Sequence, residues 1–478
     1  MLKNFLKFSF GSWVSAAISF FTVPIITLLI NPEQFGKAAM FTLAFGILSQ
    51  IVLFGTDQSF MRFFYEYEEK KRPALLWNAI FLSLVVWCII SVALICCWKW
   101  ISNWLISEHH ILIVGLLSTN LLIGLFNRFA VLVIRMQKKG IFFSLLQIAT
   151  SIITAIVIIV YSKVVANTFY AIVWAGIFSS LTMTIIAVIK EHNFWFTHMS
   201  ISQTQIKAML TYGLPFLPAC LMSMFFEGMD KIFIREFVDF EGLGLYAVAF
   251  KIVAVLTILQ GGFSIFWTPT SYEHYEKFPN DRTMYEKMFK YVSFILVFCG
   301  LSLIATKDII VLILNKTYAE TAAIMPFLIF MPIMYTLSEI TYLGINFTKK
   351  TYWHIIIFGI LLLLCPLLNY IFVPWLGVKG AALAVACSYT VYFFLRTLAS
   401  IRLYPMNFRL GKTALTFLLL YTIAGINIFI ANKTIGISCT GSAIVIYLLF
   451  HLSTIKDMFA YFKQILTNFV SVNTLNHE

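Results

Sequence analysis

The strongest constraint on the fold of this chain is a succession of long apolar segments that contain few charges. A helix needs about 20 predominantly apolar residues to cross a bilayer, and hydrophobic residues make up 60% of this 478-residue sequence. The segments are continuous rather than alternating, which favours helices over a membrane barrel. The fourteen predicted spans cover residues 8–30, 38–59, 75–97, 111–134, 141–161, 169–189, 212–236, 243–267, 291–308, 323–346, 352–373, 380–400, 413–431 and 437–454.

This pattern predicts an all-α polytopic membrane protein and excludes soluble enzymes, nucleic-acid-binding proteins and disordered scaffolds. The net charge of +13 does not indicate nucleic acid, because membrane proteins concentrate Lys and Arg in cytoplasmic loops. The first apolar run, residues 8–30, is too long for a cleaved leader and lacks a small-residue cleavage site, so we expect an uncleaved first helix. The weakest span is the ninth, which Lys307 and Asp308 interrupt.

The distribution of Lys and Arg predicts the orientation of the spans. With the N-terminus in the cytoplasm, 23 of the 34 basic residues fall in inner segments and 8 in outer segments. This assignment counts Arg396 among the inner segments and leaves Arg128, Lys231 and Lys251 inside spans. Because basic residues favour the cytoplasmic side, both termini are predicted to be cytoplasmic.

A weak internal repeat connects the two halves of the chain. The segment that starts at Glu33 resembles the segment that starts at Glu241, with Gly36 matching Gly244. Six spans separate the copies, so both have the same orientation in the membrane. Parallel repeats are typical of transporters that bind their substrate between two lobes. A chance similarity of two amphipathic loops is the alternative.

The repeat predicts a division into two six-helix lobes and a C-terminal extension. Ser202 and Gln205 have the spacing of a capping box, so we expect part of the linker between the lobes to form a helix on the inner surface. The predicted regions are an N-lobe (1–190), a cytoplasmic linker (191–211), a C-lobe (212–400), and two further helices with a cytoplasmic tail (401–478).

Charged residues inside or at the ends of spans are the candidate functional residues, because a charge in a membrane is costly and by default marks a pathway. Glu227, Lys231 and Arg235 recur every four residues and so share one helix face, which we expect to line a water-filled cavity. The alternative is that Glu227 and Lys231 merely neutralise each other. The full set comprises the acids Asp57, Glu227, Asp230 and Glu339 and the bases Arg62, Arg128, Lys231 and Lys251.

The sequence contains no complete motif for catalysis, a cofactor or a metal. Gly411-Lys412-Thr413 resembles the end of a phosphate-binding loop, but Met406 occupies the position of its first glycine. The adjacent His109 and His110 cannot share one helix face, and the eight cysteines form no metal-binding or disulfide pattern. The outer connections are too short for the catalytic residues of a membrane polymerase or ligase. We therefore expect a protein that is not an enzyme and has no cofactor.

Several segments resemble the polysaccharide-repeat flippases of the multidrug/oligosaccharidyl-lipid/polysaccharide exporter superfamily. The first is Phe20–Thr27 followed by Asn31–Gly36, which is similar to their first hairpin, and the second is Gly55–Phe64, at the end of their second helix. Tyr212–Pro215, Asp230–Phe233 and Gly244–Lys251 resemble their seventh and eighth helices. The topological resemblance covers the whole chain. Peptidoglycan-precursor flippases of the superfamily have a cationic first helix, which residues 8–30 lack.

The resemblance implies a bacterial inner-membrane flippase that moves undecaprenyl-pyrophosphate-linked oligosaccharides outward by alternating access, for O-antigen, lipopolysaccharide or other surface polysaccharide synthesis. Its partners would be the lipid-linked substrate, the bilayer, a polysaccharide polymerase and glycosyltransferases. A multidrug exporter, or an exporter of another lipid-linked precursor, is the first alternative. A membrane polysaccharide polymerase or ligase, which would need a large outer loop with catalytic residues, is a further one.

In this reading Arg128 and Arg62 meet the pyrophosphate near the inner side, and Lys251 and Lys231 meet it near the outer side. Asp57, Glu227, Asp230 and Glu339 are then coupling or charge-pairing residues, and coupling to protons or to sodium stays open. In the purely structural alternatives, Asp57 pairs with Arg62, and Arg128 forms a salt bridge to another helix, for example to Glu339.

Overall fold

The computed structural model of the chain describes residues 2–197, 200–430 and 432–458. The described residues form helices and contain no strand. Thirteen helices are long and apolar enough to cross a membrane, and the pair α10 and α11, bent by 47°, makes a fourteenth span. Each predicted span overlaps one of these helices, so the prediction of a multi-pass all-α membrane protein is confirmed.

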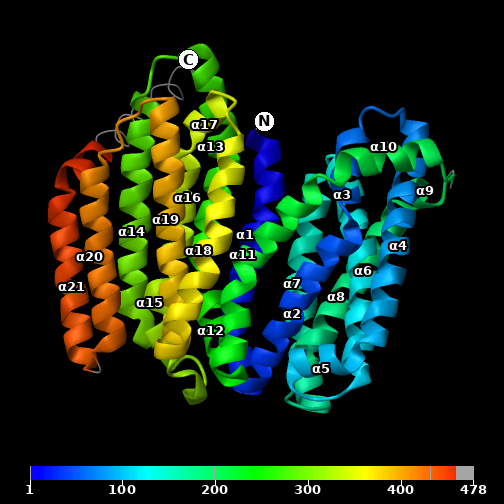
Figure 1. Cartoon of the computed structure of the whole chain (residues 1–478), viewed down its shortest axis with the longest axis horizontal. Coiled ribbons are helices and arrows are strands. Elements are labelled where there is room, and N and C mark those ends of the chain that lie inside the picture. Colours follow the sequence, from blue (N-terminus) through cyan, green and yellow to red (C-terminus); the bar gives the residue numbers. More distant parts are fainter. Residues whose placement is uncertain (1, 198–199, 431, 459–478) are drawn as a thin grey trace, which may run out of the picture. The chain divides into compact units, whose positions relative to one another are not determined.

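The helices follow one another with short connections (Figure 1). The first half of the chain contains α1 (Leu2–Leu29), α2 (Pro32–Leu53), α3 (Thr56–Phe63), η1 (Glu69–Lys71), α4 (Arg72–Cys96), α5 (Trp98–Ile106), α6 (Ile111–Met136), α7 (Gly140–Val164), α8 (Tyr170–Lys190), α9 (His192–Phe196), α10 (Gln203–Gly213), α11 (Phe216–Phe237) and α12 (Phe240–Val253). The second half contains α13 (Val255–Lys277), α14 (Thr283–Leu312), η2 (Lys316–Tyr318), α15 (Thr321–Leu328), α16 (Phe330–Thr341), α17 (Leu343–Phe347), α18 (Tyr352–Leu376), α19 (Val378–Leu403), α20 (Leu410–Phe429) and α21 (Lys433–Phe450).

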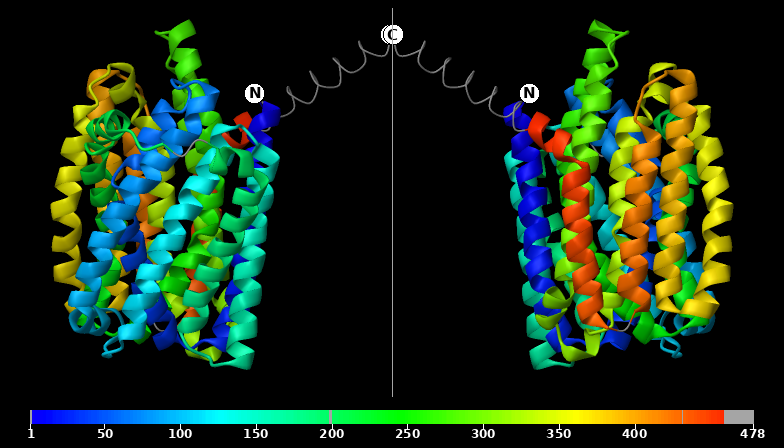
Figure 2. Two further views of the ribbon diagram at one scale, coloured as in Figure 1. Left: turned by 90° about the vertical axis from the view of Figure 1, so that its right-hand side faces the viewer. Right: turned by 90° about the vertical axis from the view of Figure 1, so that its left-hand side faces the viewer.

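The packing divides the chain into two compact units. Among the described residues, the first unit contains those up to 258 together with 313–320 and 362–381, and the second contains 259–312, 321–361 and 382–458. In the first unit α1 lies beside α7 (Figure 2), and the backbone N–H of Gly11 donates to Ser144 Oγ at 3.1 Å. In the second unit α20 lies beside α21 (Figure 1). These compact units are not the two lobes expected from the repeat, because the lobes are defined by internal symmetry and the units by packing. The boundaries of the lobes therefore stay a prediction.

The ninth span, which looked weakest in the sequence, is the continuous helix α14. Lys307 is 5% exposed, and its Nζ lies 2.7 Å from Asp308 Oδ2. The ion pair lowers the cost of placing these two charges in a span, and the helix continues to Leu312. The second and eighth spans are broken instead, at Phe54–Gly55 between α2 and α3 and at Ala254 between α12 and α13.

The capping box predicted for Ser202 and Gln205 is wrong, although α10 does begin at Gln203. The Ser202 side chain makes no capping hydrogen bond. Both residues are instead held by Asn78 of α4, whose Oδ1 accepts from the Ser202 backbone N–H at 2.8 Å and whose Nδ2 donates to Gln205 Oε1 at 2.8 Å. A buried amide of another helix, which local spacing cannot reveal, therefore orders the start of α10.

The two copies of the internal repeat contact each other at the starts of α2 and α12. Each helix begins after a capping side chain, Asn31 in one copy and Asp239 in the other. A Cβ atom built on Gly36 would lie 1.9 Å from the carbonyl oxygen of Phe240, and one built on Gly244 would lie 1.8 Å from that of Pro32. Pro32 and Phe240 are the first residues of their helices. The contact is therefore reciprocal, as a local twofold relation requires, and it needs glycine on both sides.

Reporter fusions test the predicted orientation of the spans. We expect reporters fused at Ser107 and Lys163 to lie outside the cell, and reporters fused at Lys71 and Lys350 to lie in the cytoplasm. Basic residues concentrate in the connections that contain Lys71 and Lys350, which favours the cytoplasmic side. Alkaline phosphatase and green fluorescent protein activities measure the two cases. The opposite pattern at all four positions would overturn the assignment. The C-terminal tail expected in the cytoplasm lies largely outside the described residues.

Candidate functional site

A cavity of about 280 Å³ in the first unit brings together three of the predicted functional residues. It lies among α2, α11 and α12, with Ile172 of α8 also in its wall. Glu227 and Lys231 come from α11, and Lys251 comes from α12. Apart from the hydroxyl of Thr42, the remaining wall is apolar, since Phe35, Ala38, Ala39, Leu43, Gly46, Met224, Gly228, Ala247 and Phe250 line it. The cavity therefore places two ammonium groups in a largely apolar site.

Lys251 is the less neutralised of the two cations. Its Nζ lies 4.8 Å from the centroid of the Phe35 ring, a cation–π contact that stabilises the ammonium group. Among the residues that the structure describes, no carboxylate lies within ion-pair distance of this ammonium group. Lys251 thus presents an uncompensated positive charge next to the cavity.

Lys231 is held more tightly and is partly neutralised. Its Nζ donates to the backbone carbonyl of Glu227 at 3.0 Å, lies 3.6 Å from Asp230 Oδ1 and faces the Phe250 ring at 5.2 Å. Asp230 is 3% exposed and accepts a hydrogen bond from the Tyr246 hydroxyl. Asp230 therefore acts as a buried anchor for Lys231 and Tyr246 and does not line the cavity. Glu227 is an exposed residue that lines the cavity.

Arg235, the third member of the charged stripe, points elsewhere. Its guanidinium donates to the backbone carbonyls of Asn103 and Trp104, each at 3.3 Å, and to Ser107 Oγ at 3.1 Å. These acceptors lie in or directly after α5, so Arg235 ties α11 to α5. The helical spacing correctly groups Glu227 with Lys231, but the last turn of α11 meets a different neighbour.

Asp57 and Arg128 form an ion pair between α3 and α6. Asp57 Oδ2 accepts from Arg128 Nη2 at 2.6 Å and from Nε at 3.2 Å. The Asp57 side chain is 5% exposed and that of Arg128 is 38% exposed. The carboxylate is therefore buried and depends on its partner, while the guanidinium keeps one side open to other ligands.

The alternative pairings considered from the sequence are corrected by this geometry. Arg62 does not pair with Asp57, because it binds Glu66 one turn later. Arg128 does form a salt bridge to another helix, as one of the alternatives expected, but its partner is Asp57 of α3. Glu339, the partner suggested for it, accepts a hydrogen bond from Ser264 in the second unit.

The sequence did not lead us to predict one buried arginine of the second unit, Arg396, as a functional candidate. Arg396 lies inside α19, is 8% exposed, and donates from Nη1 to Tyr392 Oη at 2.7 Å and to Ser338 Oγ at 3.0 Å. Its guanidinium also stacks 4.1 Å from the centroid of the Tyr342 ring. Its assignment to an inner connection was wrong because α19 continues to Leu403. The sequence could have indicated its burial, since Arg396 falls within the predicted span 380–400.

The described residues contain no group of three or more His, Cys, Asp or Glu that could hold a metal ion. Of the cysteines, Cys365 is buried and all eight are free. The chemistry that the cavity offers is electrostatic. Two fixed ammonium groups, an adjacent carboxylate and an apolar wall suit the binding of an anion that carries an apolar portion.

Residues 25–323 match the sequence model of a family described as polysaccharide biosynthesis protein. The chain belongs to this polysaccharide biosynthesis protein family. No curated protein matches the sequence. The match covers α2 to α14 and therefore all the helices that form the cavity.

Solved structures show that this polysaccharide biosynthesis protein has a transporter fold. The structure of the lipid II flippase MurJ in an inward closed conformation aligns with a TM-score of 0.70 at 17% identity, over 94% of this chain and 99% of that chain. An inward-facing multidrug resistance MATE family transporter of the MOP superfamily aligns with a TM-score of 0.62 at 14% identity, over 85% and 96% of the two chains. The predicted resemblance in fold is therefore confirmed.

Proposed function

We propose that the protein is a flippase that moves undecaprenyl-pyrophosphate-linked oligosaccharide repeat units from the cytoplasmic to the outer leaflet. The observation that carries the proposal is the cavity in which Lys251 and Lys231 converge from two helices. Membership of the polysaccharide biosynthesis protein family and the transporter fold support it. The product would serve cell-surface polysaccharide synthesis, of which O-antigen and lipopolysaccharide synthesis are specific cases.

The energetics of the cavity favour an anionic ligand. An unpaired cation inside a span costs about 2.5–3.5 kcal/mol on insertion scales, and the Phe35 ring offsets part of this cost for Lys251. A pyrophosphate offers charge-assisted hydrogen bonds to both ammonium groups. The volume of about 280 Å³ suits a headgroup rather than a whole oligosaccharide, so the sugars would lie outside this cavity.

The remaining candidates receive roles according to their partners. The open side of Arg128, next to Asp57, would meet the pyrophosphate near the cytoplasmic surface, with Arg62 as a second cation. Asp57, Glu227 and Glu339 are the proposed coupling acids, for protons or for sodium. Asp230 would keep Lys231 in place. We place the chain in a bacterial inner membrane with both termini cytoplasmic, where glycosyltransferases supply its substrate and a polymerase consumes the product.

A multidrug exporter is the second candidate, because the fold also matches a MATE family transporter and Glu227 lies in the same cavity. A cavity that binds a cationic drug needs more negative than positive charge. In this cavity two cations face one exposed acid, so the anionic lipid is the better fit.

Replacement of Lys251 tests the proposal. We expect Lys251→Gln to lower export at least ten-fold, because a hydrogen bond to a charged group contributes about 1.5–3 kcal/mol and tenfold corresponds to about 1.4 kcal/mol. Lys251→Arg should retain part of the activity, since it keeps the charge. The measurement is the accumulation of lipid-linked repeat units on the cytoplasmic side of a strain that expresses only the variant.

Lys163→Gln is the matched control, because it removes one exposed lysine at the end of α7 and leaves the cavity unchanged. Wild-type export by Lys251→Gln at normal membrane levels would contradict the role of this residue. Loss of drug resistance with normal lipid export would instead favour the multidrug exporter.

A further inference from the structure

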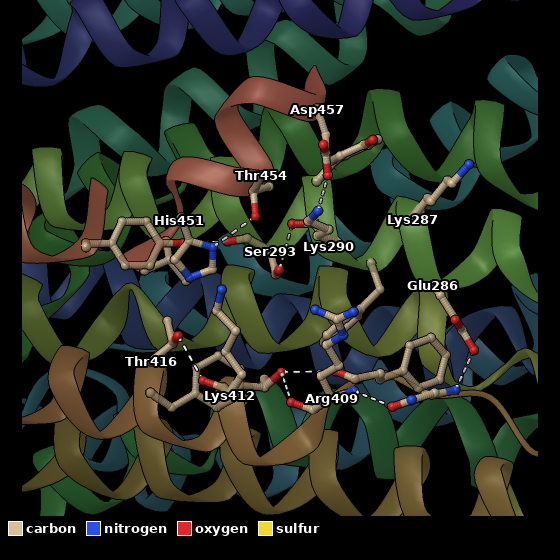
Figure 3. Close-up of a pocket in the computed structure, with 18 of the residues that line it drawn as sticks. Glu286, Lys287, Lys290, Ser293, Arg409, Lys412, Thr416, His451, Thr454 and Asp457 are labelled. Carbon is tan, nitrogen blue, oxygen red and sulfur yellow. Dashed lines mark hydrogen bonds and ion pairs between the residues drawn. The ribbon is translucent and has the colours of Figure 1, made fainter. Parts of the chain in front are cut away.

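A second, larger cavity lies in the second unit and shares no lining residue with the first. It has a volume of about 560 Å³ and is lined by α14, α20 and the segment that follows α21 (Figure 3). We call it the α14–α20 cavity. It lies toward the end of these helices that holds Thr283, Arg409 and His451, which the charge distribution predicts to be cytoplasmic.

Basic side chains dominate the wall of the α14–α20 cavity. Lys287 and Lys290 come from α14, Arg409 directly precedes α20, and Lys412 lies in its first turn. Figure 3 shows Lys412 and His451 pointing toward one another from opposite sides. The first turn of a long helix adds a partial positive charge at the same place. Four cations and a helix N-terminus therefore surround one space.

The acids in the wall leave three of these four cations without a carboxylate partner. Asp457 is occupied by Lys290, whose Nζ lies 2.5 Å from its Oδ2, and the Glu286 carboxylate accepts the backbone N–H of Asn407 at 2.7 Å. Within the part of the chain that the structure describes, Lys287, Arg409 and Lys412 have no carboxylate within ion-pair distance. Lys412 Nζ instead donates to the backbone carbonyl of Phe450 at 3.1 Å.

His451 supplies an independent observation. Its ring is 6% exposed and lines the cavity, and its Nε2 is buried without a hydrogen-bond partner among the described residues. Burial and the charges of Lys412 and Lys290 lower the pKa of His451 to about 4, so the ring is neutral at pH 7. A buried ring nitrogen without a partner is costly, and a ligand in the cavity would satisfy it.

We propose that the α14–α20 cavity binds a phosphate group, carried by an anionic membrane lipid or free in solution. Phosphate is the anion that several Lys and Arg side chains and a helix N-terminus recognise together. The volume exceeds that of one phosphate, and Phe289, Phe408, Phe417 and Val297 provide an apolar part of the wall. Lys412 and Thr413 of the Gly411-Lys412-Thr413 segment, although not part of a nucleotide-binding loop, thus contribute to this site.

Binding measurements on the full-length purified protein test this site. One arm titrates inorganic phosphate into protein in nanodiscs of phosphatidylcholine. The other compares retention of phosphatidylglycerol by the protein, measured by native mass spectrometry after extraction from mixed-lipid nanodiscs. We expect wild-type protein to bind in at least one arm, and the arm that responds identifies the source of the phosphate. The double variant Arg409→Gln/Lys412→Gln should weaken that binding by roughly ten-fold per lost charged contact.

Lys433→Gln is the matched control, because Lys433 lies at the opposite end of α21, its side chain is 79% exposed, and it is outside the cavity. Should the double variant fail to reach the membrane, Lys287→Gln replaces it, since Lys287 is an exposed lining residue. Absence of binding in both arms, or equal binding by wild type and the lining variants, would overturn the proposal.

Discussion

Alanine at Gly36 or Gly244 is expected to separate the starts of α2 and α12 and to stop export. The added Cβ would lie 1.9 Å or 1.8 Å from a backbone carbonyl oxygen of the other helix. A backbone carbonyl cannot rotate away as a side chain can, so the helices themselves must move. Overpacking typically costs about 1–3 kcal/mol, which is enough to shift a two-state conformational equilibrium by roughly five- to more than one hundred-fold.

Distances between spin labels measure this separation. Labels replace Glu33 and Glu241, which occupy equivalent positions three residues before the two glycines and lie at exposed sites. We expect a longer distance distribution in each alanine variant than in the parent protein. Gly176→Ala is the matched control, because Gly176 is also helical and has no atom within 4 Å of its built Cβ. Unchanged distances and export in both variants would show that the contact is not needed.

Removal of Arg128 is expected to destabilise the protein as well as to block export. Breaking a buried pair from one side costs about 3–5 kcal/mol, and the partial exposure of Arg128 places the expected loss at the lower end. Arg128→Ala should therefore lower the membrane level of the protein and its thermal unfolding temperature. The cause is Asp57, whose carboxylate would remain buried without its partner.

The double variant Asp57→Asn/Arg128→Gln separates stability from function. Two neutral amides remove the buried charge, so the membrane level should recover, and a double-mutant cycle measures the coupling. If Arg128 also binds the headgroup, the stable double variant will still not export. Full export by the double variant would contradict that binding role. Asp57→Asn alone, present at normal levels but inactive, would support a coupling role for this acid.

The sequence by itself determined the spans and the class of fold. Their positions follow from apolar runs long enough to cross a bilayer, a local property that the structure reproduces in every span. The correspondence of Gly36 with Gly244 was also visible. The sequence further indicated that Glu227 and Lys231 share one helix face, because a helix has a fixed period.

The tertiary structure decided which charges meet. Asp57 could pair with Arg62 within its own helix by spacing, but it binds Arg128 of α6, seventy-one residues away. Arg235 binds α5 and does not join Glu227 and Lys231 at the cavity. Arg396 is buried and donates hydrogen bonds to Ser338 and Tyr392. Ion pairs and cavities depend on distances between helices, and periodicity along one helix does not specify which helix lies opposite. The capping of α10 by Asn78, the reciprocal glycine contact and both cavities are consequences of packing for the same reason.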